Sequence, residues 1–340
     1  MRILALETSC DDTCAAVITP AGEIRANVIS SQGIHDRYGG AVPEIASRHH
    51  LELIGDVVDD ALERAGARLE EIELVGVTVG PGLVAALLVG VATAKALAAV
   101  HRIDLAPVDH LHGHLAASFL APSGDSGTGG AFEPPFLSLL ASGGHTLLAL
   151  VRDYGPGFEV IGQTLDDAAG EAFDKGARLL GLGYPGGAAL EALAGTGDPQ
   201  AFEFPIASRV SGLNFSFAGL KTALLYRVRE LGEAETERRS ADLAASYQRA
   251  IVESLVLRVQ RAISQTGIER VAVGGGVAAN GALRRRLATL DVSLDVPSRE
   301  LCTDNAAMIA SAARFVEPLP YPQYLDLDVY ATGERALAVP

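Results

Sequence analysis

Tryptophan is absent from this chain of 340 residues, aromatic residues make up only 5%, and there are three cysteines and two methionines. A core with so few rings must be built from aliphatic and small side chains. The 37 glycines and a hydrophobic fraction of 49% are typical of closely packed α/β layers. Three cysteines cannot form a disulfide framework, which indicates a reducing compartment. The N-terminus becomes acidic too early for a signal peptide, so we expect a cytoplasmic protein.

Basic residues are scarce as well. The chain has 27 Lys and Arg against 42 Asp and Glu, which gives a net charge of −15. Proteins bind the phosphates of nucleic acids mainly through clustered Lys and Arg. A role on nucleic acid would therefore require a local basic patch or a partner protein.

One uncharged run is long enough to cross a bilayer. Val75–Ala94 contains twenty residues without a charge. Gly80-Pro81-Gly82 interrupts this run, and the residues before the turn resemble a buried strand. We therefore predict a strand over Leu74–Val79 and a buried helix over about Leu83–Val100, and we expect no membrane association.

A pattern of three strands occurs twice in the chain. The predicted strands are Ile3–Ser9, Cys14–Thr19 and Ile24–Ser30 in the first copy, and Phe136–Ser142, Thr146–Val151 and Phe158–Gln163 in the second. An offset of 133 residues aligns Ser9 with Ser142 and Thr13 with Thr146 without a gap. Internal duplication of this kind is informative about the fold.

This duplication is typical of the α/β, two-lobe, actin-like nucleotide-binding fold shared by actin, sugar kinases and Hsp70. We predict a first lobe over 1–133 plus about 303–325, a second over 134–302, and a tail over 326–340. Ala121–Gly130 has the composition of a flexible linker between the two copies.

In that fold, the first hairpin turn of each lobe binds phosphate through backbone N–H groups. Here the turns contain Asp11 and Asp12 in the first copy and Ser142-Gly143-Gly144 in the second. Glycine lets the backbone approach a phosphate closely, and the carboxylates could reach a metal-bound water or orient a nucleophile. An acidic tight turn with no further role is the plainer alternative.

The following segment predicts a helix from Thr164 or Asp166, as N-cap, to Leu180. Gly181–Gly186 contains the spacing G-x-G-x-x-G, but it follows a helix and includes Pro185. It is therefore no dinucleotide fingerprint, and the sequence contains no G-x-x-x-x-G-K-[ST] phosphate loop.

A third glycine-rich segment follows the predicted strand Arg270–Val273. The run Gly274-Gly275-Gly276 would allow a flat base or a ribose to lie on the backbone at a strand's carboxyl end. Asn280 could then hydrogen-bond ribose hydroxyls. We predict helices at Ala241–Thr266 and Gly281–Leu290 on either side.

Two histidines four residues apart suggest a metal site. His110 and His114 fall where a helix is expected to open, so they would share one face and could bind one divalent metal. His112 would point to the other side. Thr303 or Asp304 is predicted to cap a later helix, and Asp304 would complete a two-histidine, one-carboxylate set with positions open for substrate oxygens.

Other classes of protein fit less well. A peptidase of the H-E-x-x-H type needs a glutamate directly after its first histidine, and that position is Leu111. An inactive actin-like scaffold would be expected to lose the candidate ligands. A small-molecule kinase of the same superfamily is the remaining enzyme alternative.

Ten collinear segments carry a family resemblance: Glu7–Thr13, Gly39–Arg48, Gly80–Leu83, His110–His114, Ser142–Thr146, Asp166–Lys175, Tyr184–Gly187, Phe215–Thr222, Gly275–Asn280 and Cys302–Asn305. Over about residues 2–315 the chain resembles the universal tRNA threonylcarbamoyladenosine synthases, once regarded as O-sialoglycoprotein endopeptidases. Glu191, His112 and His49 depart from the family pattern, and none is among the expected ligands.

The resemblance implies transfer of a threonylcarbamoyl group from its adenylate to the exocyclic amine of the adenosine beside the anticodon, in tRNAs that read codons starting with A, with release of AMP. It implies one divalent metal, iron or zinc, on His110, His114 and Asp304, with Mg²⁺ beside the nucleotide left open. It places the adenylate on Leu140, Ala141, Ser142, Gly143, Gly144, Asp174, Gly187 and Asn280.

The same resemblance implies partners for the acidic chain: tRNA, a paralogous actin-like dimerisation subunit and a small ATPase. The attacking amine must lose a proton during the transfer. Asp11 or Asp12 is our candidate acceptor.

Overall fold

A computed structural model describes residues 2–33, 42–121, 132–183, 185–206 and 210–331. The predicted linker, from residue 122 onward, lies outside these ranges, as do residues 39–41 and Tyr184 of the family segments. The chain divides into two compact units. Unit 1 comprises Met1–Glu133, Asp153–Gly157 and Asp304–Pro340, and unit 2 comprises Pro134–Arg152 and Phe158–Thr303.

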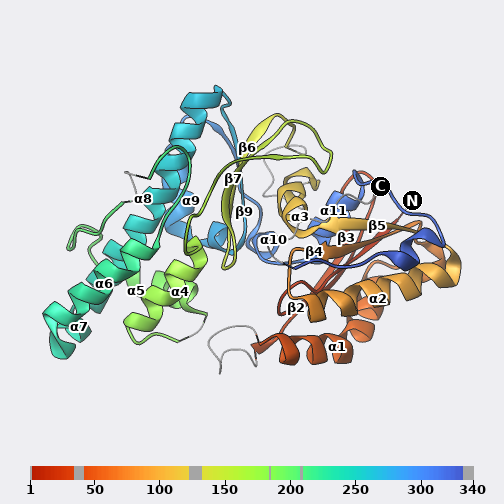
Figure 1. Ribbon diagram of the computed structural model, residues 1–340, viewed down its shortest axis with the longest axis horizontal. Coiled ribbons are helices and arrows are strands. Elements are labelled where there is room, and N and C mark those ends of the chain that lie inside the picture. The colour runs from red at the N-terminus through yellow and green to blue at the C-terminus, as the bar shows by residue number, and fades with distance from the viewer. Residues whose placement is uncertain (1, 34–41, 122–131, 184, 207–209, 332–340) are drawn as a thin grey trace. The chain divides into compact units, whose positions relative to one another are not determined.

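Unit 1 contains a five-stranded sheet with the order β3-β2-β1-β4-β5 (Figure 1). β1, β2 and β3 form an antiparallel meander, and β4 and β5 add parallel to β1. The strands are β1 (Ile3–Glu7), β2 (Asp12–Ile18), β3 (Ile24–Ser31), β4 (Leu74–Gly80) and β5 (Asp104–Asp109). The helices are α1 (Pro43–Arg64), α2 (Val84–His101), α3 (His110–Ala116) and α11 (Ala306–Ala313), with short 3₁₀ turns at Leu69–Glu71, Ala117–Phe119 and Gln323–Asp326.

Helices cover both faces of this sheet. α1 and α2 lie on one face, and α3 and α11 lie on the other (Figure 1). Every residue of β1 and β4 is buried as a result. Strands covered on both faces read as continuous apolar runs rather than as alternating patterns, which explains the sequences ILALE and LVGVTVG.

Unit 2 repeats this topology, because its sheet reads β8-β7-β6-β9-β10 from one edge. The strands are β6 (Phe136–Ala141), β7 (Thr146–Val151), β8 (Glu159–Gln163), β9 (Arg270–Gly274) and β10 (Ser293–Asp295). The helices are α4 (Ala169–Leu179), α5 (Gly186–Ala194), α6 (Ala218–Leu231), α7 (Glu233–Arg238), α8 (Ser240–Thr266), α9 (Gly281–Leu287) and α10 (Arg299–Cys302), with a 3₁₀ turn at Gly276–Ala279.

The register of the two meanders confirms the duplication. Ile3 pairs with Ile18 in the first hairpin, and Phe136 pairs with Val151 in the second. Phe136 lies 133 residues after Ile3, and Val151 lies 133 residues after Ile18. This is the offset that aligns the two copies in the sequence. The two hairpins therefore have the same register and turn position, and the second is one residue pair longer at the turn.

The apolar segment before His101 forms helix α2, close to the predicted bounds. By length and composition alone α2 could cross a membrane, with a mean hydropathy of 1.8. Such a test is also passed by core helices of proteins without membrane spans. Val91, Ala94 and Ala98 of α2 belong to the hydrophobic core of unit 1, but only 39% of the helix is buried, and Leu88 and Val100 are exposed. The predicted buried helix is therefore buried along one face only.

The helix predicted over Thr164–Leu180 begins later than expected, at Ala169. Thr164 pairs with Phe215 in an isolated bridge. The Asp166 carboxylate accepts hydrogen bonds from the backbone N–H of Phe217 and Ala218, at 2.7 and 3.2 Å. The predicted capping residue thus caps a different helix, α6, which begins about fifty residues later in the sequence.

The other predicted elements of unit 2 agree within a few residues. The strand Arg270–Val273 is confirmed as β9, and the helix Ala241–Thr266 is confirmed as α8. The predicted helix Gly281–Leu290 ends at Leu287 instead, where α9 stops.

Candidate metal centre and nucleotide site

Helix α3 begins at His110 because Asp109 caps it. The Asp109 Oδ1 atom accepts hydrogen bonds from the backbone N–H of Leu111 and His112, at 2.8 and 3.1 Å. The other oxygen of Asp109 accepts a 2.5 Å hydrogen bond from the Tyr330 hydroxyl. The predicted tail therefore contributes to fixing the first turn of α3.

α3 packs closely against α11. A Cβ atom at Gly113 would lie only 2.6 Å from Cδ1 of Ile309, so a larger residue here would require the end of the Ile309 side chain to move. The Ser311 hydroxyl donates a 2.6 Å hydrogen bond to the carbonyl of Ala116. The packing brings the segment just before α11 to the histidine face of α3.

The prediction that Thr303 or Asp304 caps this later helix was wrong. Asn305 is the N-cap of α11, and its side chain accepts a 3.0 Å hydrogen bond from the N–H of Met308. Asn305 thus does the capping, and the Asp304 carboxylate is turned to the histidines. The Cys14 thiol donates to the Asp304 carbonyl at 3.7 Å and helps to hold this backbone.

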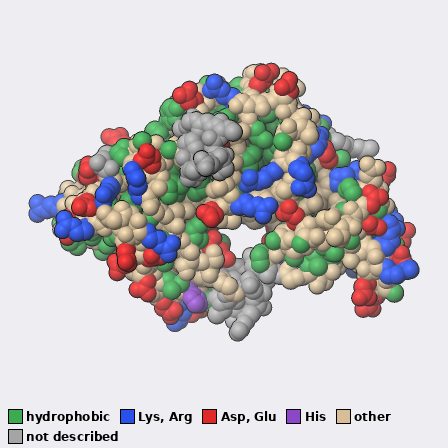
Figure 2. Space-filling model, turned by 180° about the vertical axis from the view of Figure 1, so that it is seen from behind, with side chains coloured by type: hydrophobic (Ala, Val, Ile, Leu, Met, Phe, Trp, Pro, Cys, Tyr) green, Lys and Arg blue, Asp and Glu red, His purple; other side chains and the backbone are tan. Residues whose placement is uncertain are grey.

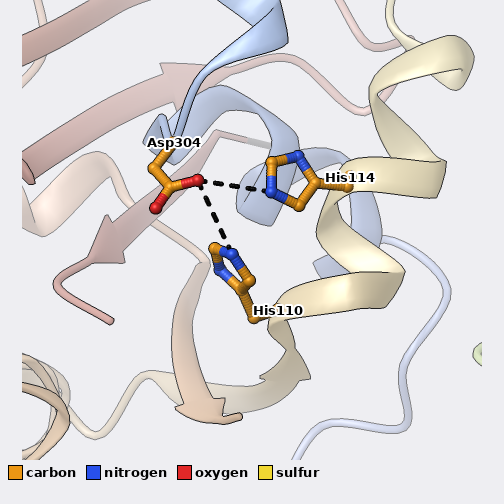
Figure 3. A group of neighbouring side chains, drawn as sticks. All are labelled: His110, His114 and Asp304. Atoms are coloured by element: carbon orange, nitrogen blue, oxygen red, sulfur yellow. Dashed lines mark ion pairs between the residues drawn. The ribbon is translucent and has the colours of Figure 1, made fainter. Parts of the chain in front are cut away.

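His110, His114 and Asp304 form one group (Figure 3). Their potential ligand atoms all lie within 4.8 Å of one another. The Oδ1 atom of Asp304 lies 3.3 Å from Nε2 of His114 and 3.6 Å from Nε2 of His110. Both histidines are more than nine-tenths buried.

These separations fit a metal ion. Metal–ligand bonds of about 2.0–2.2 Å in a tetrahedral site place neighbouring donor atoms roughly 3.3–3.5 Å apart. A divalent cation could therefore bind with little movement of the side chains. Three protein ligands leave at least one position open, as in catalytic rather than structural zinc sites.

Glu7 was not identified from the sequence, although it belongs to this site. It ends strand β1, it is fully buried, and its Oε2 atom lies 2.9 Å from Nδ1 of His110. Burial alone would lower the pKa of His110, but the carboxylates of Glu7 and Asp304 outweigh it and raise this pKa to about 9. Burial would raise the pKa of Glu7, and the charge of His110 lowers it. A lone carboxylate at the end of an apolar strand was the available clue.

His112 takes no part in the group. It is almost completely buried, and burial lowers its pKa to about 4. The side chain is therefore neutral at physiological pH, as expected for a histidine within the packing of α3.

The acidic turn between β1 and β2 lies in the same unit. Burial and the charge of nearby Asp304 raise the pKa of Asp12, and the hydrogen bond from Ser31 lowers it. The result is a pKa of about 7. His50 of α1 also holds this turn, because its Nε2 atom lies 3.0 Å from the carbonyl of Cys10. The sequence identified Asp11 and Asp12 but not the role of His50.

In unit 2, the predicted phosphate turn lies against the start of α4. The N–H of Gly170 donates a 3.0 Å hydrogen bond to the carbonyl of Ser142. Leu140 and Ala141 are buried at the end of β6, whereas Gly143 and Gly144 are exposed with open space beside them. The backbone of these two glycines is thus accessible to a ligand.

Two separate hydrogen bonds fix the segments that contain the remaining predicted residues of unit 2. Asp174 of α4 accepts a 2.9 Å bond from the N–H of Gly186, next to Gly187. Glu191 of α5 accepts a 2.8 Å bond from the N–H of Gly281, next to Asn280. Glu191, which we set aside as a departure from the family pattern, therefore connects α5 to the start of α9.

Asn280 has a structural function in addition to any contact with a ligand. Its side-chain oxygen caps α9 by accepting from the N–H of Leu283 at 3.0 Å, and its amide donates to Gln248 at 2.8 Å. One amide N–H remains for a ribose hydroxyl.

A hollow of about 650 Å³ also lies in unit 2. Pro135, Ile268 and Arg270 line it, at the amino ends of β6 and β9. Ligands of α/β sheets bind at the carboxyl ends of strands, so this hollow is separate from the predicted nucleotide residues.

Comparison with known proteins agrees with the family segments. Residues 23–311 match the family model TsaD, described as tRNA N6-adenosine threonylcarbamoyltransferase. The enzyme of that name from Geotalea uraniireducens is 49% identical over 316 residues, covering 91% of this chain and 90% of the relative. The one from Anaeromyxobacter sp. is 51% identical over 319 residues, covering 92% and 93%.

Solved structures of the same fold share little sequence with this chain. HypF from T. kodakarensis matches with a TM-score of 0.60 at 15% identity, over 92% of this chain and 47% of that one. Component A of the (R)-2-hydroxyglutaryl-CoA dehydratase of Acidaminococcus fermentans matches with a TM-score of 0.51 at 16% identity, over 93% and 96%. These likenesses support the actin-like fold.

Proposed function

Because this chain belongs to the TsaD family of tRNA N6-adenosine threonylcarbamoyltransferases, we propose that its donor is threonylcarbamoyl-adenylate and that its metal site lies in unit 1. The activity is transfer of a threonylcarbamoyl group to N6 of a tRNA adenosine. In the proposed reaction, this amine nitrogen forms a bond to the carbamoyl carbon. The bond from that carbon to the phosphate oxygen breaks, and AMP leaves with the electron pair.

The group of His110, His114 and Asp304 is the observation that carries the assignment of the site. Its donor atoms lie at metal-ligand separations, and nitrogen and carboxylate donors suit iron or zinc. A cation bound there would supply Lewis-acid stabilisation of charge on a phosphate oxygen, with Mg²⁺ beside the nucleotide as an alternative source. The protein contributes the orientation of the three ligands and the burial of the two histidines, whereas the Asp304 side chain stays partly exposed.

Unit 2 is proposed to hold the adenylate. The exposed glycines of the turn Ser142-Gly143-Gly144 offer backbone N–H groups to phosphate. Asp174, Gly187 and Asn280, together with Leu140 and Ala141, would bind the remaining parts of the nucleotide. The hydrogen bond from the N–H of Gly281 to Glu191 supports this, because it ties α5 to the start of α9.

The proton of the attacking amine is proposed to pass to Asp12. A carboxyl group whose pKa lies near 7 is matched to accepting a proton at neutral pH. Asp11 is the alternative acceptor in the same turn.

The distribution of charge bears on how tRNA binds. Unit 2 contains 17 of the 27 Lys and Arg and 18 of the 42 Asp and Glu, so nearly all of the net charge of −15 belongs to unit 1. On the face seen in Figure 2, acidic and basic side chains are interspersed, with one group of Lys and Arg near the middle. We propose that tRNA meets unit 2 rather than the acidic surface of unit 1.

Partner proteins are proposed to supply further binding surface, namely a paralogous actin-like dimerisation subunit and a small ATPase. The reaction would take place in the cytoplasm, where tRNA and reduced thiols are found. Efficient multiple-turnover modification by this chain alone would contradict the need for partners.

The test replaces His110 and His114 together by alanine. We expect the double variant to lose bound metal and transfer from purified adenylate to unmodified tRNA, measured by metal analysis and by nucleoside chromatography. The matched control replaces His49 and His101, which lie outside the group, and should keep both. Turnover at the wild-type rate without bound metal would refute the proposed site.

A further inference from the structure

The carboxylate of Glu7 is held by three donors inside unit 1. The backbone N–H of Ser9 donates to Oε1 at 2.5 Å, and the Thr78 hydroxyl donates to Oε2 at 2.7 Å. The third partner is Nδ1 of His110, at 2.9 Å from Oε2. A buried carboxylate is costly unless its oxygens are satisfied, so this arrangement is built to keep the charge in place.

This contact determines which nitrogen of His110 can bind a metal. An ionised carboxylate only accepts hydrogen bonds, so Nδ1 must carry the proton that lies between it and Glu7. When the ring is neutral, as metal binding requires, the lone pair then belongs to Nε2, the atom that faces Asp304 at 3.6 Å. The Ser9 hydroxyl, 3.2 Å from Nδ1, lies on the same side of the ring as Glu7.

His114 differs in this respect. Its Nε2 atom faces Asp304 at 3.3 Å, but its buried Nδ1 atom has no hydrogen-bond partner among the described residues. The two imidazoles are therefore not equivalent. Nδ1 of His110 is fixed by a carboxylate, whereas Nδ1 of His114 has no such partner among the described residues.

We propose that Glu7 is a positioning residue for the metal site, which sets the tautomer and the ring orientation of His110. The inference rests on the metal site proposed above. Carboxylates behind metal-binding histidines raise the basicity of the ligand and fix its ring, and their loss typically lowers metal affinity 10- to 100-fold.

The informative substitution is Glu7→Gln, which keeps the shape of the side chain. The short bond from Ser9 N–H retains the amide oxygen at the position of Oε1, so the NH₂ group faces His110. An amide N–H requires Nδ1 of His110 to accept, which moves the ring proton to Nε2 and blocks the metal-binding atom. The Thr78 hydroxyl can rotate and accept the second amide hydrogen.

Thr78→Val is the matched control. It removes one hydrogen bond to the same carboxylate and leaves the proton between Glu7 and His110 unchanged. A role of Glu7 in local stability alone predicts similar effects of the two substitutions on metal binding. A role through His110 predicts a large effect of Glu7→Gln only.

The experiment titrates Zn²⁺ into the chelator-treated full chain in competition with a chromophoric chelator. We expect a 10- to 100-fold loss of affinity in Glu7→Gln and less than a 3-fold change in Thr78→Val. Cooperative melting of both metal-free variants shows that each remains folded at the temperature of the titration. Equal Zn²⁺ affinity of Glu7→Gln and wild type would overturn the inference. Failure of the wild type to bind Zn²⁺ would instead overturn the metal site itself.

A second measurement needs no variant. Nitrogen-15 spectra of the histidine rings in the Zn²⁺-loaded wild type should show His110 bound through Nε2 with a proton on Nδ1. Binding through Nδ1, or an Nδ1 atom without its proton, would overturn the inference even if Glu7→Gln failed to fold.

Discussion

Replacement by alanine should have different effects at two neighbouring glycines after β9: it should lower stability at Gly275 and leave stability nearly unchanged at Gly276. Gly275 has φ 84° and ψ 160°, a region that is almost restricted to glycine. A Cβ atom there would lie 2.4 Å from the carbonyl oxygen of Ala141 in β6, and this neighbour is backbone that cannot turn away. Gly276 has no atom within 4 Å of the corresponding position.

The cost of Gly275→Ala follows from these two features. The backbone conformation contributes about 1–3 kcal/mol, and overlap with the strand contributes about 1–3 kcal/mol more. A loss of about 4 kcal/mol in the free energy of unfolding corresponds to a fall in Tm of roughly 8–16 °C for a unit of this size.

Gly276→Ala should leave Tm within about 2 °C of the wild type, because the methyl group enters open space. If the nucleotide lies on this segment, the same methyl group should weaken AMP binding by roughly tenfold, equivalent to about 1.4 kcal/mol. Scanning calorimetry and AMP titration of the two variants separate packing from ligand contact. A Tm of Gly275→Ala within 2 °C of the wild type, or unfolding of Gly276→Ala, would contradict the difference described for the two positions.

Three further predictions follow from individual side chains. Asp12→Asn should slow single-turnover transfer by about 10²–10⁴-fold. The wild-type rate should rise with pH through about 7, the pKa to which burial raises Asp12, and level off above it. A rate independent of pH between 5.5 and 8.5 would contradict this. Asp166→Ala should cost about 1–2 kcal/mol at neutral pH through loss of the α6 cap. Burial opposes ionisation of Asp166, but the hydrogen bonds that it accepts from Ser216 and the backbone lower its pKa. This stabilisation is therefore lost as pH falls below about 4. The difference in Tm between the wild type and Asp166→Ala should shrink there rather than persist. Less than one thiol per native chain should react rapidly with a disulfide reagent, because Cys14 and Cys302 are completely buried and burial raises the pKa of Cys10. All three cysteines should react after denaturation. Rapid reaction of two thiols per native chain would contradict this prediction.

Patterns within a single segment predicted the structure well. The duplicated meander was readable because strand length and turn position recur at a fixed offset, and the structure reproduces that offset in the pairing of Ile3 and Phe136 with their partners. The spacing of His110 and His114 was readable because residues four apart share a helix face.

Roles that depend on distant partners could not be predicted from local sequence. Thr164 and Asp166 have the composition of a helix start, but they bond to Phe215 and Phe217, which lie some fifty residues further along the chain. Asp304 was expected to cap a helix that Asn305 caps instead. Glu7 lies 103 residues before His110. The sequence around either residue does not indicate that the two side chains are in contact.

Unit 1 is built from both ends of the chain, with residues 134–152 and 158–303 inserted between its parts. A growing polypeptide therefore carries both imidazoles long before it carries the carboxylate that completes their group. Chains released before residue 304 would contain β1 to β5 but neither Asp304 nor the helix packed beneath α3. The proposed metal site can therefore be completed only after the insertion has been synthesised, and a chain that ends before residue 304 should bind metal more weakly than the whole chain.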